Sequence, residues 1–510
     1  MEEERNGSRE RSAPYSPHHG TNPINSVEES SHDHRSKRRK HGPILEEEED
    51  RISTLLDSIL LRILSSLLTK DAIKTGVLSK RWAYLWTSVP SLCFTDTSFK
   101  NADVLATAVD ESLLLHRAPK LTNFSVLFKY KPHLKRRVDR WVRFATTAKV
   151  DQLSLRLSAS HLDPYENDTY KLPQHLYADE FVSELDFHFC EIKPNGLVGW
   201  SSLKRLCIGY TDLSEDVINK VLMGSPKLEF LKLQNCVDFN RFDILLESLR
   251  KLVIDSCSLT CHEPIELEIV APKIESLEIL GHFYGMTKCQ IKDGSALVEV
   301  KLDFEISIDY ESGEAEEVLK DSFEVVSELF ENLHQVKKLF VGEWCLKILS
   351  IMSVKNLPSP SVNCKCLTMK ATVEKWDLPG IAILLQSFPY VETLVIDIIS
   401  KRDFLATSLL ICYDEMSHSK SKEVYFKSSL RFLKTVKIFG FRKSFHIEEV
   451  FILVVEFLLK NAKVLEKLVI TEPQVMQNET HDMLLKYLQV SQKLLSFPRA
   501  SPRAVVMFPF

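Results

Sequence analysis

Residues 212–233, D-L-S-E-D-V-I-N-K-V-L-M-G-S-P-K-L-E-F-L-K-L, contain one complete structural unit. Ser214 is placed to cap a helix that runs to about Leu222, and Gly224 is placed to end it. From Leu228 the apolar residues follow the order L-x-x-L-x-L, which predicts a short strand with alternate side chains on one face. The stretch therefore predicts a helix, a turn and a strand in immediate succession.

The strand half of this unit recurs along the chain. Its pattern is apolar, two residues, apolar, one residue, apolar, and the spacing between copies is mostly about 21 to 32 residues, close to the leucine-rich-repeat period of about 20 to 29. Each copy is expected to be a strand facing a shared core, with the intervening stretch crossing back, often as a helix. The thirteen copies are LTNFSV (121), VDQLSL (150), VSELDF (182), LKRLCI (203), LEFLKL (228), LRKLVI (249), IESLEI (274), LVEVKL (297), VKKLFV (336), CKCLTM (364), VETLVI (391), LKTVKI (433) and LEKLVI (465).

Three copies extend to L-x-Φ-x-x-C and end at Cys190, Cys236 and Cys257. This is the Asn/Cys position of leucine-rich repeats, so these thiols are expected to turn inward and support the loop that leaves the strand. A metal site is disfavoured because neither candidate group has paired C-x-x-C spacing. Those groups are Cys257, Cys261 and His262, and Cys364 with Cys366.

Two longer gaps precede VKKLFV and LKTVKI. The first holds the acidic stretch 309–317 and then an amphipathic pattern that predicts a helix; the second holds the polar run 417–423. Both are candidate binding loops, and a solvated helix face and a disordered loop are equally compatible with them. The apolar positions of the predicted helix are Val318, Phe323, Val326, Leu329 and Phe330.

Bulk composition narrows the class of protein. The chain has 510 residues, 44% hydrophobic residues and a net charge of -5, which gives no general reason to expect nucleic acid or an anionic membrane as partner. No stretch approaches the roughly 18 uninterrupted apolar residues of a membrane span. Since the N-terminus lacks a hydrophobic segment, we expect a soluble intracellular protein whose eleven cysteines are reduced.

Residues 1–48 are rich in Ser, Glu, His and Arg and are expected to be a disordered charged tail. Within them the basic cluster 35–40 predicts a nuclear import signal carried by Lys37, Arg38, Arg39 and Lys40. A solvated charge run is the alternative. The expected location is the nucleus or the cytoplasm, with the nucleus favoured.

Residues 49–94 combine two adjacent leucine and isoleucine stripes with the aromatic stretch V-L-S-K-R-W-A-Y-L-W at 77–86. Helical spacing predicts three short helices, the second capped by Thr69 or Asp71 and the third by Ser79. About 45 residues are too few to cover this much apolar surface, because domains of that size need a metal, disulfides or a partner. The excess predicts a protein partner.

The segment resembles an F-box over almost its whole length. The matching blocks are D-R-I-S (50–53), L-x-D (55–57), I-L-x-x-I-L-S (59–65), T-K-D-A (69–72) and V-L-S-K-R-W-x-x-L-W (77–86). The last block and G-S-P-x-L-E (224–229) are similar to plant F-box proteins with leucine-rich repeats. Residues 433–441 and 455–470 look like the FBD module that ends many of them.

The resemblance implies an α/β architecture. Its expected parts are an F-box of three short helices (49–95), an irregular leucine-rich-repeat solenoid of parallel strands and crossover helices (96–415), an FBD-type α/β cap (416–475) and a C-terminal tail (476–510). Proline is usual at the positions of Leu56 and Leu68. Its replacement is expected to blur where the first two helices begin and end and to weaken the partner interface.

The function implied by the resemblance is that of a substrate receptor in an SCF-type cullin-RING ubiquitin ligase. The F-box would dock on a Skp-type adaptor and through it on cullin, while the repeats hold an unidentified target protein. The residues expected to face the adaptor are Leu55, Ile59, Leu60, Ile63, Leu64, Leu67, Val77, Trp82 and Leu85. The alternative for each is packing inside the three-helix unit.

Two other classes of function remain open. One is a repeat scaffold that has lost adaptor binding. The other, direct nucleic-acid binding through 35–40 or through Lys135-Arg136-Arg137, is unlikely because these clusters are short. The sequence contains no Gly-rich phosphate loop, H-E-x-x-H motif or nucleophile elbow, so we expect neither an enzyme nor a cofactor.

Overall fold

The computed structural model describes residues 52, 54–158, 169–238, 241–256, 265–307, 315–355, 357–358, 362–400, 430–441, 448–471 and 481–508. The chain divides into two units, residues 1–55 and residues 56–510. Every helix and strand given below lies in the second unit. The predicted charged tail and the predicted import signal Lys37–Lys40 lie outside the described residues.

The second unit begins with short helices. They are α1 (Asp57–Leu64), α2 (Thr69–Lys74), η1 (Thr75–Val77) and η2 (Trp82–Ser88). Leu56 and Leu68 are the N-cap residues of α1 and α2, with φ of -68° and -61° and extended ψ. The expectation that losing proline would blur these helix starts was wrong, because both leucines adopt the φ that a proline ring imposes.

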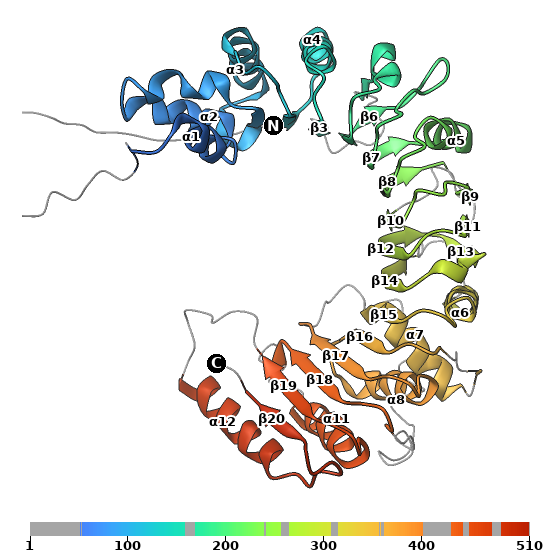
Figure 1. Ribbon diagram of the computed structural model, residues 1–510. Coiled ribbons are helices and arrows are strands. Elements are labelled where there is room, and N and C mark those ends of the chain that lie inside the picture. Colours follow the sequence, from blue (N-terminus) through green and yellow to red (C-terminus); the bar gives the residue numbers. More distant parts are fainter. Residues whose placement is uncertain are drawn as a thin grey trace, which may run out of the picture. The chain divides into compact units, whose positions relative to one another are not determined.

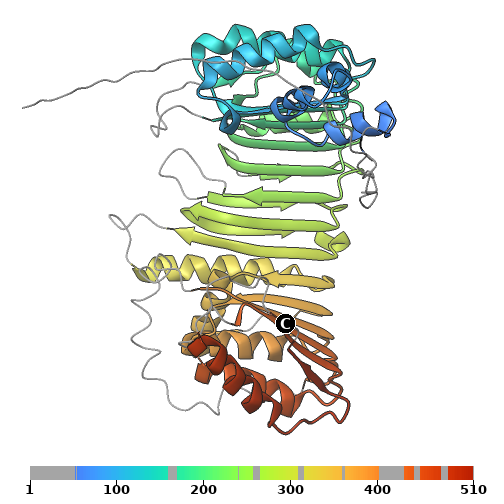
Figure 2. The same cartoon turned by 90° about the vertical axis from the view of Figure 1, so that its left-hand side faces the viewer.

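A sheet of fifteen parallel strands follows, and Figure 2 shows the strands stacked edge to edge. Each of the thirteen predicted strands is confirmed and begins at the third residue of its motif. The strands, in spatial order, are β1 (Ser91–Thr95), β2 (Asn123–Lys129), β3 (Gln152–Ser158), β5 (Glu184–His188), β7 (Arg205–Asp212), β8 (Phe230–Val237), β10 (Lys251–Asp255), β12 (Ser276–Tyr284), β14 (Glu299–Ser307), β15 (Lys338–Val341), β16 (Cys366–Ala371), β17 (Thr393–Ile398), β18 (Thr435–Phe439), β19 (Lys467–Thr471) and β20 (Val505–Met507).

The register places the repeated apolar residues in rows across the sheet. Leu185, Leu206, Leu231, Leu252 and Leu277 are successive partners on adjacent strands, and each is at most 1% exposed. A one-residue slip would turn a whole row to solvent, so the repeated pattern itself fixes the register. The rows form one continuous hydrophobic core along the sheet.

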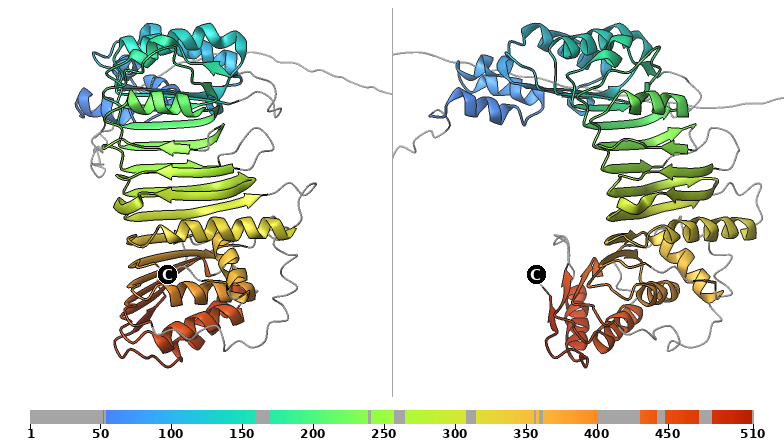
Figure 3. Two further views of the ribbon diagram at one scale, coloured as in Figure 1. Left: turned by 90° about the vertical axis from the view of Figure 1, so that its right-hand side faces the viewer. Right: turned by 45° about the vertical axis from the view of Figure 1, so that its right-hand side comes forward.

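Helices cover one face of the sheet, and the other face is open (Figures 1 and 3). The crossover helices are α3 (Ala102–Leu115), α4 (Lys135–Thr147), α5 (Glu215–Met223), α6 (Ala315–Glu331), α7 (Glu343–Val354), α8 (Leu378–Ser387), α11 (Glu448–Asn461) and α12 (His481–Leu495). Short 3-10 turns lie at η3 (Asp96–Ser98), η4 (Pro132–Leu134), η5 (Gln174–Ala178), η6 (Gly294–Ala296) and η7 (Lys375–Asp377). Where the crossovers are extended, short strands stand in place of helices: β9 (Arg241–Asp243), β11 (Ile265–Val270) and β13 (Met286–Lys292) form one small sheet, and β4 (Tyr170–Lys171) and β6 (Cys190–Glu191) another.

The unit around α5 agrees with its sequence except in two details. Ser214 is the N-cap residue, but its side chain makes no capping hydrogen bond, and Gly224 follows the helix with an ordinary φ of -81°. Glycine is needed at 224 for space, because an added Cβ would lie 2.3 Å from the carbonyl oxygen of Val198.

The inward cysteines are confirmed where the structure describes them. The Cys190 thiol lies 3.4 Å from the carbonyl oxygen of His188, and the Cys236 thiol lies 3.6 Å from those of Ile208 and Gln234. Both are buried and bind the backbone of their own or a neighbouring strand. Cys257 lies outside the described residues.

The helix predicted after the acidic insert is confirmed as α6, with Val326, Leu329 and Phe330 buried. Most of the acidic stretch 309–317 and all of the polar run 417–423 lie outside the described residues.

The end of the chain differs from the expected tail. Residues 481–507 contain α12 and β20, and β20 pairs in parallel with β19. Val506 lies opposite Leu468, so this segment continues the repeat pattern. The boundary expected at 476 therefore lies within the sheet domain.

Candidate functional site

The short helices at the start of the second unit have a small core of their own. Leu60 and Leu64 of α1 are at most 1% exposed, and Trp82 and Trp86 of η2 are each 7% exposed. These residues do not belong to the core of the repeat sheet. The segment is thus a separate packed layer attached to the first strand.

The residues expected to face an adaptor fall into two groups. Leu60, Leu64 and Trp82 are buried within this layer, and the Leu55 and Leu85 side chains are partly buried. The exposed residues are Ile59, Ile63, Leu67 and Val77, with Val77 88% exposed. This second group and the exposed parts of Leu55 and Leu85 are available for contact without rearrangement of the helices.

Further apolar side chains on the same helices are also exposed. Ile59 and Ile63 are one turn apart on α1, and Leu56 continues their stripe at the helix start. The exposed residues outside the set expected to face the adaptor are Leu56, Ile73, Leu78 and Tyr84. Helical spacing could have indicated Leu56, whereas Leu78 and Tyr84 depend on how the 3-10 turns orient them.

An ion pair joins two of the matching sequence blocks. Arg81 donates to Asp57 Oδ1 from Nε at 2.8 Å and from Nη2 at 2.6 Å, tying η2 to the first turn of α1. The Lys80-Arg81 pair first suggests phosphate contact, but the Arg81 guanidinium is engaged by a carboxylate. Its partner is 24 residues away in sequence, so spacing alone could not have revealed it.

The helical layer is fastened to the repeat sheet at β1. The backbone N–H of Cys93 donates to Thr69 Oγ1 at 2.8 Å, and the Lys70 ammonium lies 4.8 Å from the centre of the Phe99 ring. The Lys70 ammonium also donates to the carbonyl oxygen of Ser98. Because β1 pairs with β2, the layer and the array are joined by regular structure.

The open face of the sheet carries paired charges. Arg156 contacts Asp186 on the next strand at 2.7 Å, and Lys232 lies 3.4 Å from Asp255. These side chains alternate with the buried leucines along each strand. Such a surface is suited to selective protein contacts, since complementary charge fixes the orientation of a partner.

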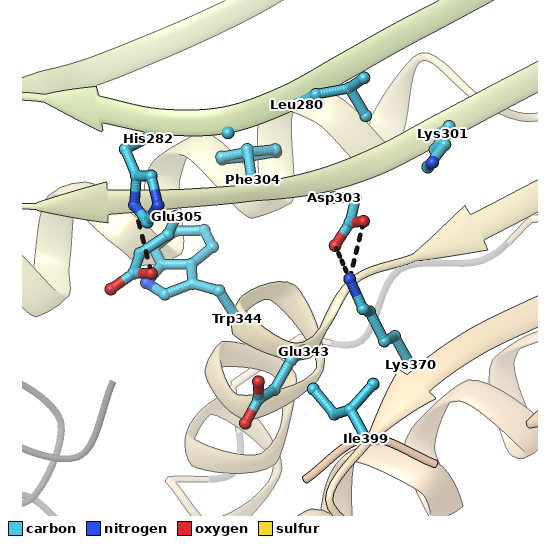
Figure 4. A pocket seen from close by; sticks show the side chains of 11 residues that line it. Leu280, His282, Lys301, Asp303, Phe304, Glu305, Glu343, Trp344, Lys370 and Ile399 are labelled. Atoms are coloured by element: carbon cyan, nitrogen blue, oxygen red, sulfur yellow. Dashed lines mark hydrogen bonds and ion pairs between the residues drawn. The ribbon is translucent and has the colours of Figure 1, made fainter. Parts of the chain in front are cut away.

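One pocket of about 240 Å³ opens on this face where β12, β14 and β16 meet the start of α7 (Figure 4). The Lys370 ammonium lies 3.1 Å from Asp303 Oδ2, and His282 Nδ1 lies 3.5 Å from Glu305 Oε2. Phe304 and Trp344, with ring centres 5.3 Å apart, line its wall. The pocket offers charges over an aromatic surface, an arrangement that can bind a polar group of a partner.

Behind this pocket lies a buried polar cluster. The Glu343 carboxylate is paired with the Lys347 ammonium, which lies 4.3 Å from the centre of the Trp376 ring. Asp377 is fully buried and accepts hydrogen bonds from Thr372 Oγ1 at 2.9 Å and the Glu374 backbone N–H at 3.0 Å. Burial raises the pKa of the Asp377 carboxyl to about 6, although the charge of Lys347 acts in the opposite direction.

The described cysteines are free thiols set in packed surroundings. Burial raises the pKa of the Cys289 and Cys364 thiols to about 12, so both are protonated at neutral pH. No group of three potential metal ligands comes together among the described residues. Within the same residues, no helix combines the length and apolar character of a membrane span.

Comparison with known proteins places most of the chain in one family. Residues 116–504 match the family model described as At1g61320/AtMIF1, LRR domain. This match runs across 416–475, the region expected to be an FBD-type cap. The FBD resemblance remains a prediction, whereas the repeat assignment extends over the whole array.

Relatives from Arabidopsis thaliana agree with this match. The putative F-box protein At1g49610 is 32% identical, over 69% of this chain and 84% of its own length. The F-box/LRR-repeat protein At5g02910 is 30% identical over 82% of this chain and 88% of its own length. The putative F-box/LRR-repeat protein At3g18150 is 32% identical, over 71% and 75% respectively.

Proposed function

Because this chain belongs to the F-box/LRR-repeat proteins with an At1g61320/AtMIF1-type LRR domain, we propose that it is the substrate-recognition subunit of an SCF-type cullin-RING ubiquitin ligase. The α1–η2 layer docks on a Skp-type adaptor and the repeat sheet holds a target protein. The chain contributes proximity to the ubiquitin-loaded enzyme, which raises the effective concentration of the target.

The observation that supports docking most directly is the exposed apolar stripe of α1 together with Val77. The layer buries its own small core and still leaves these branched side chains partly in water. Covering each half-exposed isoleucine would contribute about 1 kcal/mol, and covering Val77, which is 88% exposed, would contribute more. Apolar residues clustered on one small element are typical of an interface centre.

The test is capture of the adaptor and cullin by the full-length chain. We expect wild-type protein to retain both, and the Ile59→Asp/Ile63→Asp variant to lose at least about a hundredfold in adaptor affinity, because two buried charges would stand where two anchors pack. Leu245→Asp is the matched control, since Leu245 is 77% exposed in a loop far along the chain from α1.

The outcomes separate the ligase from a scaffold that acts without the adaptor. Adaptor capture by wild type and by Leu245→Asp, with loss in the double variant, supports the ligase subunit. A full-length chain that is monodisperse, retains a target protein and ignores the adaptor would rule that role out and favour the scaffold. Melting temperatures of the variants, compared with wild type, check that each chain is folded.

A further inference from the structure

A second cavity lies on the helix side of the array, away from the α1–η2 layer. It has a volume of about 540 Å³ and lies between α4 and the segment 171–175. Its charged lining consists of Lys135, Arg140, Arg143, Lys171, His175 and Asp139. Four side chains in this lining are permanently cationic at neutral pH, against one carboxylate.

Asp139, the carboxylate in the cleft lining, does little to neutralise the lysine and arginine side chains around it. Asp139 accepts a hydrogen bond from the Tyr170 hydroxyl at 2.8 Å, which directs it toward the core side of the cleft. Lys135, Arg143 and Lys171 have exposed side chains and make no ion pair within the part of the chain that the structure describes. The cleft therefore has an excess of positive charge.

A shielded imidazole nitrogen adds a second, independent feature. His175 Nε2 is buried and has no hydrogen-bond partner among the described residues. A buried ring nitrogen without a partner costs free energy, so a turn of the ring that brings Nε2 to the cleft and to a ligand would be favoured. Burial, and then the charge of Arg143, lower the pKa of His175, while the carboxylates of Asp139 and Asp179 act in the opposite direction.

The wall opposite α4 is held in place by its own hydrogen bonds. Gln174 Nε2 donates to the Lys193 carbonyl oxygen at 2.9 Å, and Gln174 Oε1 accepts from the Asn195 backbone N–H at 2.9 Å. Leu172 beneath it is buried. The segment is thus preorganised, and binding there does not first have to order a loop.

The positive region is bounded on the other side of α4. There Asp110 of α3 lies 3.4 Å from both Arg137 and Arg140, and Asp103 contacts His133 at 2.6 Å. An extended polyanion lying across α4 would meet these carboxylates. The geometry favours a compact anion seated in the cleft.

We propose that the cleft between α4 and residues 171–175 binds a phosphate group, with Arg143 and Lys171 providing charge from its two walls and His175 Nε2 contributing a hydrogen bond once its ring turns toward the cleft. A phosphate monoester carries close to two negative charges and three acceptor oxygens, which matches this donor set. The group can be borne by a phosphorylated protein side chain or by a small phosphorylated molecule. This inference is independent of adaptor docking.

The test measures binding to the full-length chain at physiological ionic strength. The probes are a fluorescent peptide with two neighbouring phosphoserines, the same peptide with glutamates in their place, inorganic pyrophosphate as competitor, and a single-stranded oligonucleotide. We expect the phosphate probes to bind at least about tenfold more tightly than the glutamate peptide. A tighter phosphopeptide indicates a phosphorylated protein as ligand, and a tighter pyrophosphate indicates a small molecule.

The variants locate the binding. Arg143→Gln/Lys171→Gln should weaken phosphate binding at least about tenfold, since two charge-assisted contacts are lost. Arg136→Gln is the matched control, because Arg136 is exposed on the same helix but does not line the cleft. Unchanged melting temperatures show that each variant is folded.

Three results would overturn the proposal. The first is equal affinity for the glutamate and phosphoserine peptides. The second is a loss in Arg136→Gln as large as in the double variant, which would indicate diffuse attraction by the whole helix. The third is binding of the oligonucleotide in preference to the phosphate probes, with a steep salt dependence.

Discussion

Gly224 is required because there is no room for a side chain, although its backbone angles are ones that any residue can adopt. We expect Gly224→Ala to lower the free energy of unfolding by about 1 to 3 kcal/mol or more, because the added methyl group meets the Val198 backbone. The matched control is Gly196→Ala, where nothing lies within 4 Å of the added Cβ. Urea unfolding of both variants measures the difference, and equal stabilities would contradict the steric explanation.

Asp377 predicts a pH dependence of stability. Its pKa is about 6 in the folded chain and near 3.8 ordinarily, so the folded state holds this proton more tightly than the unfolded state. Its contribution is therefore fully present below about pH 4 and is lost as the pH rises through about 6. The cost of ionising it in the folded state is about 3 kcal/mol at neutral pH.

Asp377→Asn cannot ionise, so the variant does not lose stability as the pH rises. It keeps an acceptor for Thr372 and leaves the Glu343–Lys347 pair in place. We expect the stability of the variant relative to wild type to rise between about pH 4 and pH 7. Urea midpoints across this range measure it, with Asp216→Asn, an exposed change on α5, as control for the loss of one charge. A constant difference between Asp377→Asn and wild type would show that the carboxyl does not titrate there.

At the scale of elements, the backbone at the starts of α1 and α2 has a conformation that proline can adopt. The φ angles of Leu56 and Leu68 match a proline ring, and neither backbone N–H donates a hydrogen bond to another described residue. We expect Leu68→Pro to stabilise the chain by about 0.4 to 1 kcal/mol, because proline restricts the unfolded chain. Leu68→Ala controls for the lost side chain, and a lower melting temperature for proline than for alanine would contradict the expectation.

A helix or strand could be predicted when the residues that define it are close together in the sequence. Strands such as β7 and β8 could be predicted because their apolar spacing is local. β1 carries the same spacing in V-P-S-L-C-F (89–94), but the F-box resemblance extends over these residues and hides the strand signal. At β20 the pattern is weaker, with Arg503 in the first apolar position, and the strand is recognisable only from its pairing with β19.

The candidate sites were harder to predict from the sequence than the strands, because they depend on which residues the fold brings together. Helical spacing identified Ile59 and Ile63, but it could not separate them from the buried Leu60 and Leu64, since both stripes are apolar. The proposed phosphate cleft combines α4 with residues 171–175, and the pocket in Figure 4 combines β12, β14 and β16 with the start of α7. Sites assembled over such distances leave no local signal in one sequence.

At the scale of the whole molecule, the last strand protects the array. β20 covers the outer edge of β19, and the buried Val490 and Leu494 of α12 pack on the common core. We expect truncation after residue 475 to expose this edge and to cause association in solution, because an unpaired strand edge is a template for another chain. Light scattering of the truncated and full-length chains measures the effect, and a monodisperse truncated chain with an unchanged melting temperature would contradict it.

The attachment of the helical layer to β1 affects how rigidly the layer is held against the repeat sheet. The helical layer is bonded to β1, and β1 is the first of the fifteen strands of the sheet. Among the described residues the layer therefore continues directly into the sheet, and under the proposed function no loose linker would separate the adaptor from the target. Neighbouring strands lie about 4.8 Å apart, so each repeat adds a fixed length to the array. Under the proposed function, the strand to which a target binds would set how far its lysines stand from the ligase. Inserting or deleting one repeat between β1 and that strand should then redirect ubiquitin to different lysines without changing what is bound.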